Sequence, residues 1–424
     1  MEDRIDRIQA REILTGTGRP TVEVQLTTIG GIRVSASGPS GTSKGKYEAF
    51  ELHDGGTRFR GRGVRKAIEN IHRCIAPALK NKPVTRQSEI DAILIELDGT
   101  PDKSRFGGNA LLPVSVACAK AGALACNCPC FRYLGGLSAK LLPIPAATVL
   151  AGGEHAPSSL PFEDYLLIPH GFDSFGDSLE ALVECRLVLE EKLREKFGPV
   201  PEVGGALSPP ILRTEQAFDL LLNGIESSGF GAKISLGLDA AANELYLPDR
   251  ESYRIGEDLL TVDKLSDYYA SLAKNYPFHY LEDPFHQDDF SGFASLTGKL
   301  DGIWVVGDDL FASHPARIAE GIRLRAANGL LLKMNQIGTV SESLLAANLA
   351  STNGMKVAVS VRSNETNDDF VAHFAVGIGA QLIKLGSPVR GERNAKYNCL
   401  WGIEQELGKR ATYSGKVFRK QFHG

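Results

Sequence analysis

The chain has 424 residues, more than one average domain needs, and its 43% of hydrophobic and 23% of charged residues are ordinary for a globular protein. The formal net charge of −4 and the absence of a long basic run argue against nucleic acid as a partner. The densely charged residues 1–11 lack the apolar segment of a signal peptide, and no apolar run reaches the roughly 18 residues of a membrane helix, so we expect a cytoplasmic protein without a membrane partner.

The N-terminal part of the chain is expected to contain strands followed by helices. Apolar and polar residues alternate over 21–26, and the glycine pair at 30–31 predicts a turn before another strand at 32–34. Apolar residues at helical spacing predict helices over 64–75, 87–97 and 113–125. Strands followed by clustered helices indicate an α+β domain, which we assign to residues 1–136.

The seven cysteines do not predict disulfides, because they are an odd number in a long chain. Cys126, Cys128 and Cys130 alternate along the chain, which suggests a metal clip. The spacing is not a usual zinc pattern and no second cluster follows, so we interpret these residues as buried thiols at a helix end. His373 lies in an apolar, helix-like run and is interpreted as structural.

From residue 143 onward, short apolar runs alternate with helix-like stretches. Six of these runs end at a polar residue, in order Asp239, Glu282, Asp308, Lys333, Ser360 and Lys384. From the second of these residues onward the intervals are 26, 25, 27 and 24 residues, the length of one strand–helix unit. Parallel strands at this period form a barrel or a doubly wound sheet. Two earlier runs, at 144–150 and 165–168, bring the strands to eight, so we predict an α/β fold with a (β/α)8 barrel over 143–424.

The C-terminal ends of barrel strands converge on one face, where active sites of such barrels lie. That face collects Asp239, Glu282 and Asp308 beside Lys333 and Lys384. An acidic residue after a strand often only caps the next helix, but five ionisable residues in register indicate a site. Oxygen ligands without cysteine or histidine favour Mg²⁺. Desolvation and nearby positive charge lower a lysine pKa, so a lysine here can remove a proton from a carbon next to a carboxylate, with the metal stabilising the enediolate.

Several longer motifs resemble the enolase family along nearly the whole chain. They occupy residues 10–14, 20–24 and 97–100 in the N-terminal part, and 282–285 (Glu-Asp-Pro-Phe), 307–310 (Gly-Asp-Asp-Leu) and 332–339 in the barrel. The resemblance implies an N-terminal α+β domain before a modified eight-stranded barrel of the TIM type, Mg²⁺ dependence and a homodimer or larger assembly. It also implies a lyase that abstracts the α-proton of a small phosphorylated carboxylic acid, as in the glycolytic conversion of 2-phosphoglycerate to phosphoenolpyruvate.

The resemblance assigns the metal ligands first. Asp239, Glu282 and Asp308 match the residues that hold one Mg²⁺ tightly. Ser43 lies in a segment, residues 40–45, that resembles the lid loop of the family. The resemblance makes it a ligand of a second Mg²⁺ that binds with the substrate.

The resemblance also assigns the residues that contact the substrate. Lys333 matches the base that removes the α-proton, and Lys384 matches the lysine beside the substrate carboxylate. Arg362 and Ser363 match the pair that binds the substrate phosphate, and His155 matches a histidine of a mobile loop.

Four residues of the expected site depart from the enolase pattern. Val203 stands where the family has its proton-donating glutamate, with Glu202 adjacent, and Val361 stands where the family has a histidine. The family's Gln-Glu pair is Glu163-Asp164 in this chain; we expect Glu163 to bind substrate and Asp164 to be catalytic. Valine cannot donate a proton, and loss of a general acid costs about 10²–10⁴-fold in rate.

Three functional interpretations stay open. In the first, the chain is an ordinary enolase in which Asp164 or Glu202 supplies the acid. In the second, it is a remodelled enzyme that keeps proton abstraction but has a changed elimination step, for which carboxyphosphonoenolpyruvate synthase of phosphonate metabolism is a family precedent. In the third, it is a non-catalytic binding protein with the enolase fold. That interpretation predicts loss of the metal and base positions, yet all five are retained.

Overall fold

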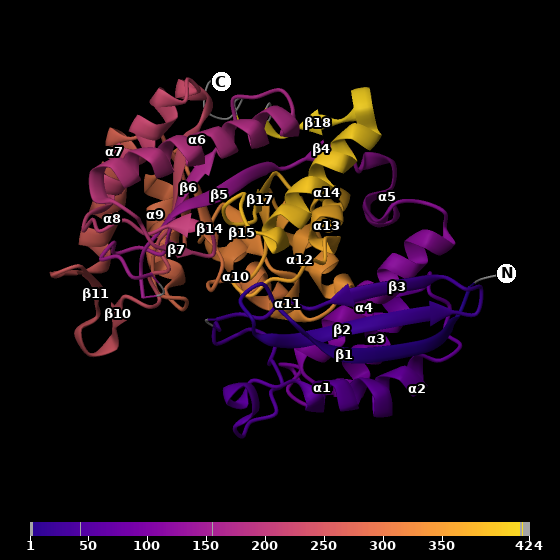
Figure 1. Cartoon of the computed structure of the whole chain (residues 1–424). Coiled ribbons are helices and arrows are strands. Elements are labelled where there is room, and N and C mark those ends of the chain that lie inside the picture. Colours follow the sequence, from indigo (N-terminus) through magenta and orange to yellow (C-terminus); the bar gives the residue numbers. More distant parts are fainter. Residues whose placement is uncertain (1–2, 43, 155, 416–417, 419–424) are drawn as a thin grey trace.

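The computed structural model describes residues 3–42, 44–154, 156–415 and 418. A small sheet packed on helices lies beside a barrel, and α5 (Cys130–Gly135) lies on the path of the chain between them (Figure 1). Ser43 and His155, both expected in the site, lie outside the described residues. The division of the chain into domains at residues 136 and 143 stays a prediction.

The N-terminal part is an antiparallel sheet packed on helices, as the order of its sequence patterns predicts. Its strands are β1 (Ile5–Leu14), β2 (Pro20–Thr28) and β3 (Arg33–Ser37), in that spatial order. Its helices are α1 (Arg65–Asn70), α2 (Ala76–Leu79), α3 (Gln87–Asp98) and α4 (Gly108–Ala125), with a π-helical turn (Ile71–Ile75) between the first two. Val22, Val24 and Leu26 of β2 are fully buried, which accounts for the alternating pattern because α4 packs on this sheet.

Helix α4 begins five residues before its predicted start. Its first residue, Gly108, and Asn109 are weak helix formers, and Pro113 lies inside the helix, where it removes one backbone hydrogen bond. Within the part of the chain that the structure describes, α4 alone has the length and apolar composition to cross a membrane, but 83% of that stretch is buried inside the protein. Helix α4 is therefore a core helix of the N-terminal part.

The second part is a closed barrel of eight strands, counted over the described residues, with helices around it (Figure 1), which confirms the predicted fold class. In order around the barrel the strands are β5 (Ile144–Ala151), β6 (Asp164–Ile168), β9 (Ser235–Asp239), β13 (Phe278–Glu282), β14 (Trp304–Gly307), β15 (Gly329–Leu332), β16 (Lys356–Ser360) and β17 (Leu382–Lys384). Strand β17 pairs with β5 and closes the barrel.

The barrel helices are α6 (Phe175–Phe197), α7 (Thr214–Ser227), α8 (Val262–Asn275), α9 (Phe290–Lys299), α10 (Pro315–Leu324), α11 (Met334–Ile337), α12 (Val340–Thr352), α13 (Phe370–Ile378) and α14 (Gly391–Leu407). Because helices cover the outer face, strands such as β9 and β14 are buried at every residue. Short strands flank the barrel: β4 (Leu141–Leu142), β7 (Glu202–Val203), β8 (Ala206–Leu207), β10 (Tyr246–Leu247), β11 (Ser252–Ile255), β12 (Asp258–Leu260) and β18 (Thr412–Tyr413).

Strand β6 departs from the predicted alternation, because it runs antiparallel to both of its neighbours, β5 and β9. The described residues between β5 and β6 form no helix that could carry the chain back to the opposite end of the barrel. As a result Asp164, the first residue of β6, pairs with Asp239, the last residue of β9. The start of β6 therefore lies at the same rim as the C-terminal ends of the other strands.

Candidate functional site

A cavity of about 470 Å³ opens at the rim where the barrel strands end. Eight acidic residues among the described ones line it: Glu48, Glu163, Asp164, Asp239, Glu244, Asp283, Asp308 and Asp309. Five cationic residues line it too: Arg19, Lys333, Arg362, Lys384 and Arg393. The acidic residues outnumber the cationic ones, and this excess of negative charge suits the binding of a divalent cation.

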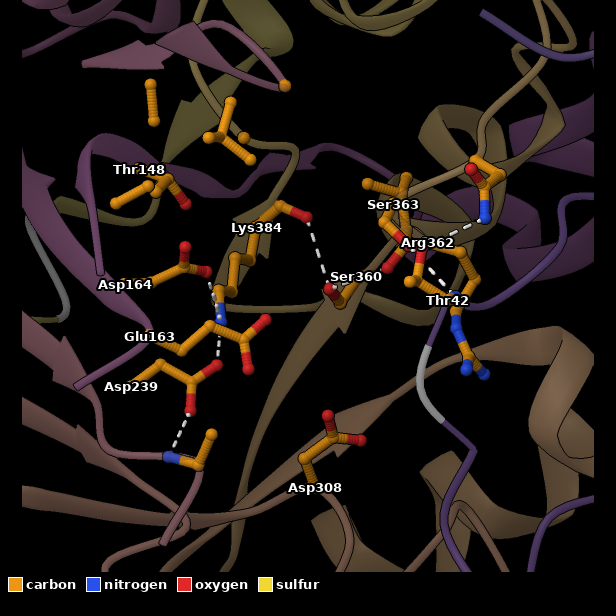
Figure 2. A pocket seen from close by; sticks show the side chains of 18 of the residues that line it. Thr42, Thr148, Glu163, Asp164, Asp239, Asp308, Ser360, Arg362, Ser363 and Lys384 are labelled. Atoms are coloured by element: carbon orange, nitrogen blue, oxygen red, sulfur yellow. Dashed lines mark hydrogen bonds and ion pairs between the residues drawn. The ribbon is translucent and has the colours of Figure 1, made fainter. Parts of the chain in front are cut away.

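Lys384 lies at the centre of the acidic side of the cavity. Its Nζ donates to Asp239 Oδ2 at 2.6 Å and to both carboxylate oxygens of Glu282 at 3.0 Å, and it lies 3.2 Å from Asp164 Oδ2. Figure 2 shows Lys384 pointing between Asp164 and Asp239. Burial lowers the pKa of Lys384, but these carboxylates outweigh it and raise that pKa well above its usual value.

Glu282 is fully buried at the end of β13. Tyr280, two residues earlier on the same face of the strand, donates its hydroxyl to Glu282 Oε2 at 2.6 Å. Burial and the nearby Asp239 carboxylate raise the pKa of Glu282 well above its usual value. A buried carboxylate in this position requires a cationic partner to remain ionised.

Lys333 and Asp308 form the second ion pair of the site. Asp308 Oδ1 also accepts from Gln336 Nε2 at 2.8 Å, and the backbone N–H of Lys333 donates to Ser313 Oγ at 2.9 Å. Burial lowers the pKa of Lys333, but Asp308 and Glu282 together raise it. Each lysine contacts at least one carboxylate in this arrangement, which raises its pKa; a lowered lysine pKa beside a metal ion stays a prediction.

Two further acidic residues, which the sequence reasoning missed, stand beside the predicted ligands. One carboxylate oxygen each of Asp283, Asp308 and Asp309 lies within 4.8 Å of the others. Asp283 accepts from the backbone N–H groups of Asp308 at 2.9 Å and Asp309 at 2.7 Å, which fixes this cluster. Burial and the neighbouring Asp308 raise the pKa of Asp309 to about 7.

The opposite side of the cavity carries cations and hydroxyls (Figure 2). Arg362 follows β16 and donates from Nη1 to Glu48 Oε2 at 2.5 Å. The hydroxyl oxygens of Thr42 and Ser363 are 2.8 Å apart, so the start of the loop at 40–45 is tied to this side. These groups suit an anion, provided that Glu48 gives up its contact with Arg362.

Arg19 and Arg393 also line this cavity, and sequence reasoning did not identify either. Nη1 of Arg19 and Nε of Arg393 are buried and have no hydrogen-bond partner within the described structure. Arg19 follows β1 and Arg393 belongs to α14, and no periodic pattern connects these positions to the barrel strands. Both groups offer unused N–H donors for an anionic ligand.

The structure brings Glu163, Asp164, Val203 and Val361 into the lining of the cavity. Burial, Asp239 and Asp164 raise the pKa of Glu163 well above its usual value. Glu202 is not among the lining residues; it is exposed, and its Oε1 accepts from Arg186 Nη2 at 2.5 Å. Successive side chains of a strand point to opposite faces, so on β7 Val203 faces the cavity and Glu202 faces away.

Comparison with known proteins agrees with this geometry. Residues 5–134 match the family model described as the enolase N-terminal domain, and residues 139–422 match the one described as the enolase C-terminal TIM barrel domain. The chain is 47% identical to the enolase of Methanothrix thermoacetophila, over 98% of this chain and 99% of that protein. It is 46% identical to the enolase of Methanopyrus kandleri, over 97% of each chain. It is 45% identical to that of Pyrococcus furiosus, over 98% of each.

Proposed function

The chain belongs to the enolase family, and on that premise we propose that its cavity binds Mg²⁺ and 2-phosphoglycerate and eliminates water to give phosphoenolpyruvate. The observation that carries the proposal is the convergence of Asp239, Glu282 and Asp308 with Lys333 and Lys384 on one barrel rim. Four of these five residues line the cavity, and the fifth, Glu282, accepts hydrogen bonds from Lys384. Three carboxylates and two lysines are the groups that proton abstraction next to a carboxylate requires.

The donor set fits a hard divalent cation. Asp239, Glu282 and Asp308 supply only oxygen atoms, and they come from three neighbouring strands of the barrel. Burial and the neighbouring Asp239 raise the pKa of Glu282, and a cation bound between these two carboxylates would favour their ionised forms. When bound, Mg²⁺ supplies positive charge for the carboxylate oxygens of the substrate as the enediolate forms. A second ion held by Ser43 stays a prediction, since that residue lies outside the described part of the chain.

Lys333 accepts the α-proton at Nζ in the proposed mechanism. In the structure Asp308 holds that ammonium group in its charged form. Asp308 would be shared between Lys333 and a bound metal, and this sharing would lower the pKa of Lys333 toward the range of a general base. Lys384 keeps its charge and binds the substrate carboxylate. The phosphate is bound by Arg362 and Ser363, which requires the contact between Arg362 and Glu48 to open.

In the proposed mechanism the Glu163–Asp164 pair donates a proton to the departing hydroxyl group. Both residues line the cavity at the start of β6, on the same rim as Lys333. Glu202 is left out of the proposed mechanism because it is paired with Arg186 outside the cavity. His155 keeps its expected role in substrate binding as a prediction outside the described residues.

The test is a direct assay of 2-phosphoglycerate dehydration with Mg²⁺, together with exchange of the α-proton in deuterated water. We expect Lys333→Ala to lower the rates of both dehydration and α-proton exchange at least about 10²-fold, because the base is absent. Lys103→Ala is the matched control, since Lys103 is a buried lysine that pairs with Glu342 at 2.9 Å outside the cavity. Equal activity of the two variants would refute the assignment of the base.

A second candidate function has one specific observation in its favour. Val203 and Val361 both line the cavity, so apolar groups replace potential proton donors within the site itself. This favours a remodelled enzyme that abstracts the α-proton but has a changed elimination step. Wild-type protein that exchanges the α-proton without dehydrating 2-phosphoglycerate would support this candidate, and turnover at the level of ordinary enolases would exclude it.

The assembly and location are proposed on the family relationship. We expect a homodimer or a larger homo-oligomer in the cytoplasm. Light scattering on the purified chain at several concentrations tests the assembly, and a monomer at all concentrations would contradict it.

A further inference from the structure

We propose that the chain holds a second metal site, for a borderline ion such as Zn²⁺, formed by Asp369, His373 and Cys399 with Cys130 as the fourth ligand. It lies away from the barrel cavity, where α5, α13 and α14 pack together (Figure 1). None of these four residues lines the cavity described above.

Three of the ligands already lie at close range. Asp369 precedes α13 and His373 follows one turn later, so that both side chains share one helix face. Cys399 comes from α14, which packs on α13. One carboxylate oxygen, one imidazole nitrogen and Sγ all lie within 4.8 Å of one another. Ligand atoms of a tetrahedral zinc site with bonds of ~2.0–2.3 Å are about 3.3–3.8 Å apart, so shifts of about 1 Å complete the arrangement.

One imidazole nitrogen of His373 lacks a hydrogen-bond partner among the described residues. Nδ1 of His373 is buried and, within the described residues, has no hydrogen-bond partner. The ring is stacked parallel on Phe131 of α5, with centroids 6.1 Å apart and planes at 3°, so it has little freedom to turn toward water. A buried polar atom without a partner destabilises the fold, and a metal ion bound to it would remove this penalty. Burial also lowers the pKa of His373, which keeps the ring in the neutral form that binds metals.

Cys130 is a neighbour of Cys399 and lies outside the group of three whose ligand atoms are within 4.8 Å of one another; we assign it as the fourth ligand. It is the first residue of α5, which packs on α13. Burial raises the pKa of Cys130 to about 11, and Asp369 is among the neighbouring groups that act on it. Burial raises the pKa of Cys399, and the nearby Asp369 and Cys130 raise it further. Both cysteines are free thiols. Lys120, a cation that acts on both Cys130 and His373, pairs with Asp368 at 2.8 Å.

The ligand chemistry distinguishes this site from the barrel cavity. Two sulfurs, one imidazole and one carboxylate select Zn²⁺ or Co²⁺ over Mg²⁺, which prefers oxygen ligands. The four residues are up to 269 positions apart in the chain, so they do not form a sequence motif that would predict a metal site. Of the three alternating cysteines, Cys126 is exposed, and we assign Cys130 alone to the proposed site. The ion would fasten α5 to the barrel helices α13 and α14.

The test uses metal-stripped full-length protein with Mg²⁺ in excess, so that the oxygen-ligand site is occupied. Co²⁺ is added as the probe, and then Zn²⁺ to displace it. We expect one Co²⁺ per chain with strong tetrahedral d–d bands and a thiolate-to-cobalt charge-transfer band in the near ultraviolet. Zn²⁺ should abolish both features. Binding without a thiolate band, or no binding, would overturn the proposal without any variant.

Variants identify the ligands. Cys399→Ser and His373→Ala are each expected to weaken Zn²⁺ binding at least tenfold and to change the cobalt spectrum. Cys130→Ser should weaken the thiolate band, and an unchanged band would remove this residue from the site. Cys185→Ser is the matched control, because Cys185 is a buried free thiol that contacts Ser228 at 3.0 Å elsewhere in the barrel. Unchanged Zn²⁺ affinity in both His373→Ala and Cys399→Ser would refute the site.

Discussion

Replacing Lys384 by methionine tests whether the buried carboxylates around it are the metal site. The substitution keeps most of the side-chain volume and removes the positive charge. In the structure that charge lies 2.6 Å from an oxygen of Asp239, 3.0 Å from Glu282 and 3.2 Å from Asp164. Without the charge, three carboxylates repel one another in a site that water reaches poorly.

The size of the effect follows from these distances. With an effective dielectric constant of about 20, two unit charges about 3 Å apart interact by roughly 5–6 kcal/mol. Desolvation of the ammonium group offsets much of this attraction, and protonation of Glu282 relieves part of the repulsion. Removing one partner from a buried ion cluster typically lowers the free energy of unfolding by about 3–5 kcal/mol. We expect Lys384→Met to lose that much stability in the absence of Mg²⁺.

The assay is urea unfolding of wild type and variant in chelator and in excess Mg²⁺. The metal replaces the missing charge, so we expect the loss to shrink to about 1–2 kcal/mol with Mg²⁺, since binding and stability are linked. Lys396→Met is the matched control, because Lys396 is fully buried and pairs with Glu365 at 2.9 Å outside the cavity. A loss in Lys384→Met that is the same with and without Mg²⁺, or a control that Mg²⁺ rescues equally, would refute the reasoning.

Three further predictions concern groups around the cavity. Tyr280→Phe removes the hydroxyl that orients Glu282 and should weaken Mg²⁺ binding about 10–100-fold in calorimetric titration; unchanged affinity would contradict this role. Burial raises the pKa of Glu51, but the hydrogen bond with His53 and nearby cations outweigh it and lower this pKa from 4.5 to about 2. The ionised form of Glu51 therefore stabilises the fold above pH 4.5, and this contribution is lost as the pH falls toward 2. Glu51→Gln should therefore lower the free energy of unfolding by about 1–3 kcal/mol at pH 7 and by progressively less in acid. A loss of stability that does not depend on pH would refute this prediction. Arg362→Lys should raise KM at least tenfold with a smaller change in kcat, because lysine cannot bind phosphate in a bidentate manner; a change confined to kcat would argue against a phosphate contact.

The sequence was sufficient to find the strand-end residues, because their period follows directly from the length of one strand–helix unit. Asp239, Glu282 and Lys384 are the last residues of their strands, and Asp308 and Lys333 follow theirs directly. Their convergence is a property of any closed parallel barrel, so the pattern alone predicts it. Asp283 and Asp309 had a weaker signal, since each directly follows a predicted ligand, and they were missed.

Other parts of the site could not be predicted from periodicity. Asp164 is the first residue of its strand, and it reaches the rim only because β6 is reversed. Arg19 and Arg393 reach the cavity through the packing of distant elements, which leaves no local signal. The raised pKa of Lys384 could not be predicted, because it depends on how many carboxylates lie about 3 Å away, and a sequence does not give that number.

The reversed direction of β6 has a consequence for how such an enzyme can change its reaction. The metal ligands and Lys333 stand at the ends of strands whose positions the barrel fixes, and Asp164 is fixed with them because it pairs with Ala151 and Asp239. Glu163 belongs instead to the connection that precedes β6. Insertions or substitutions in that connection can reposition Glu163 while Asp164, Asp239 and Lys333 keep their places. One residue of the acidic pair can therefore vary independently of the groups that remove a proton, and substrate range can diverge without rebuilding the metal centre.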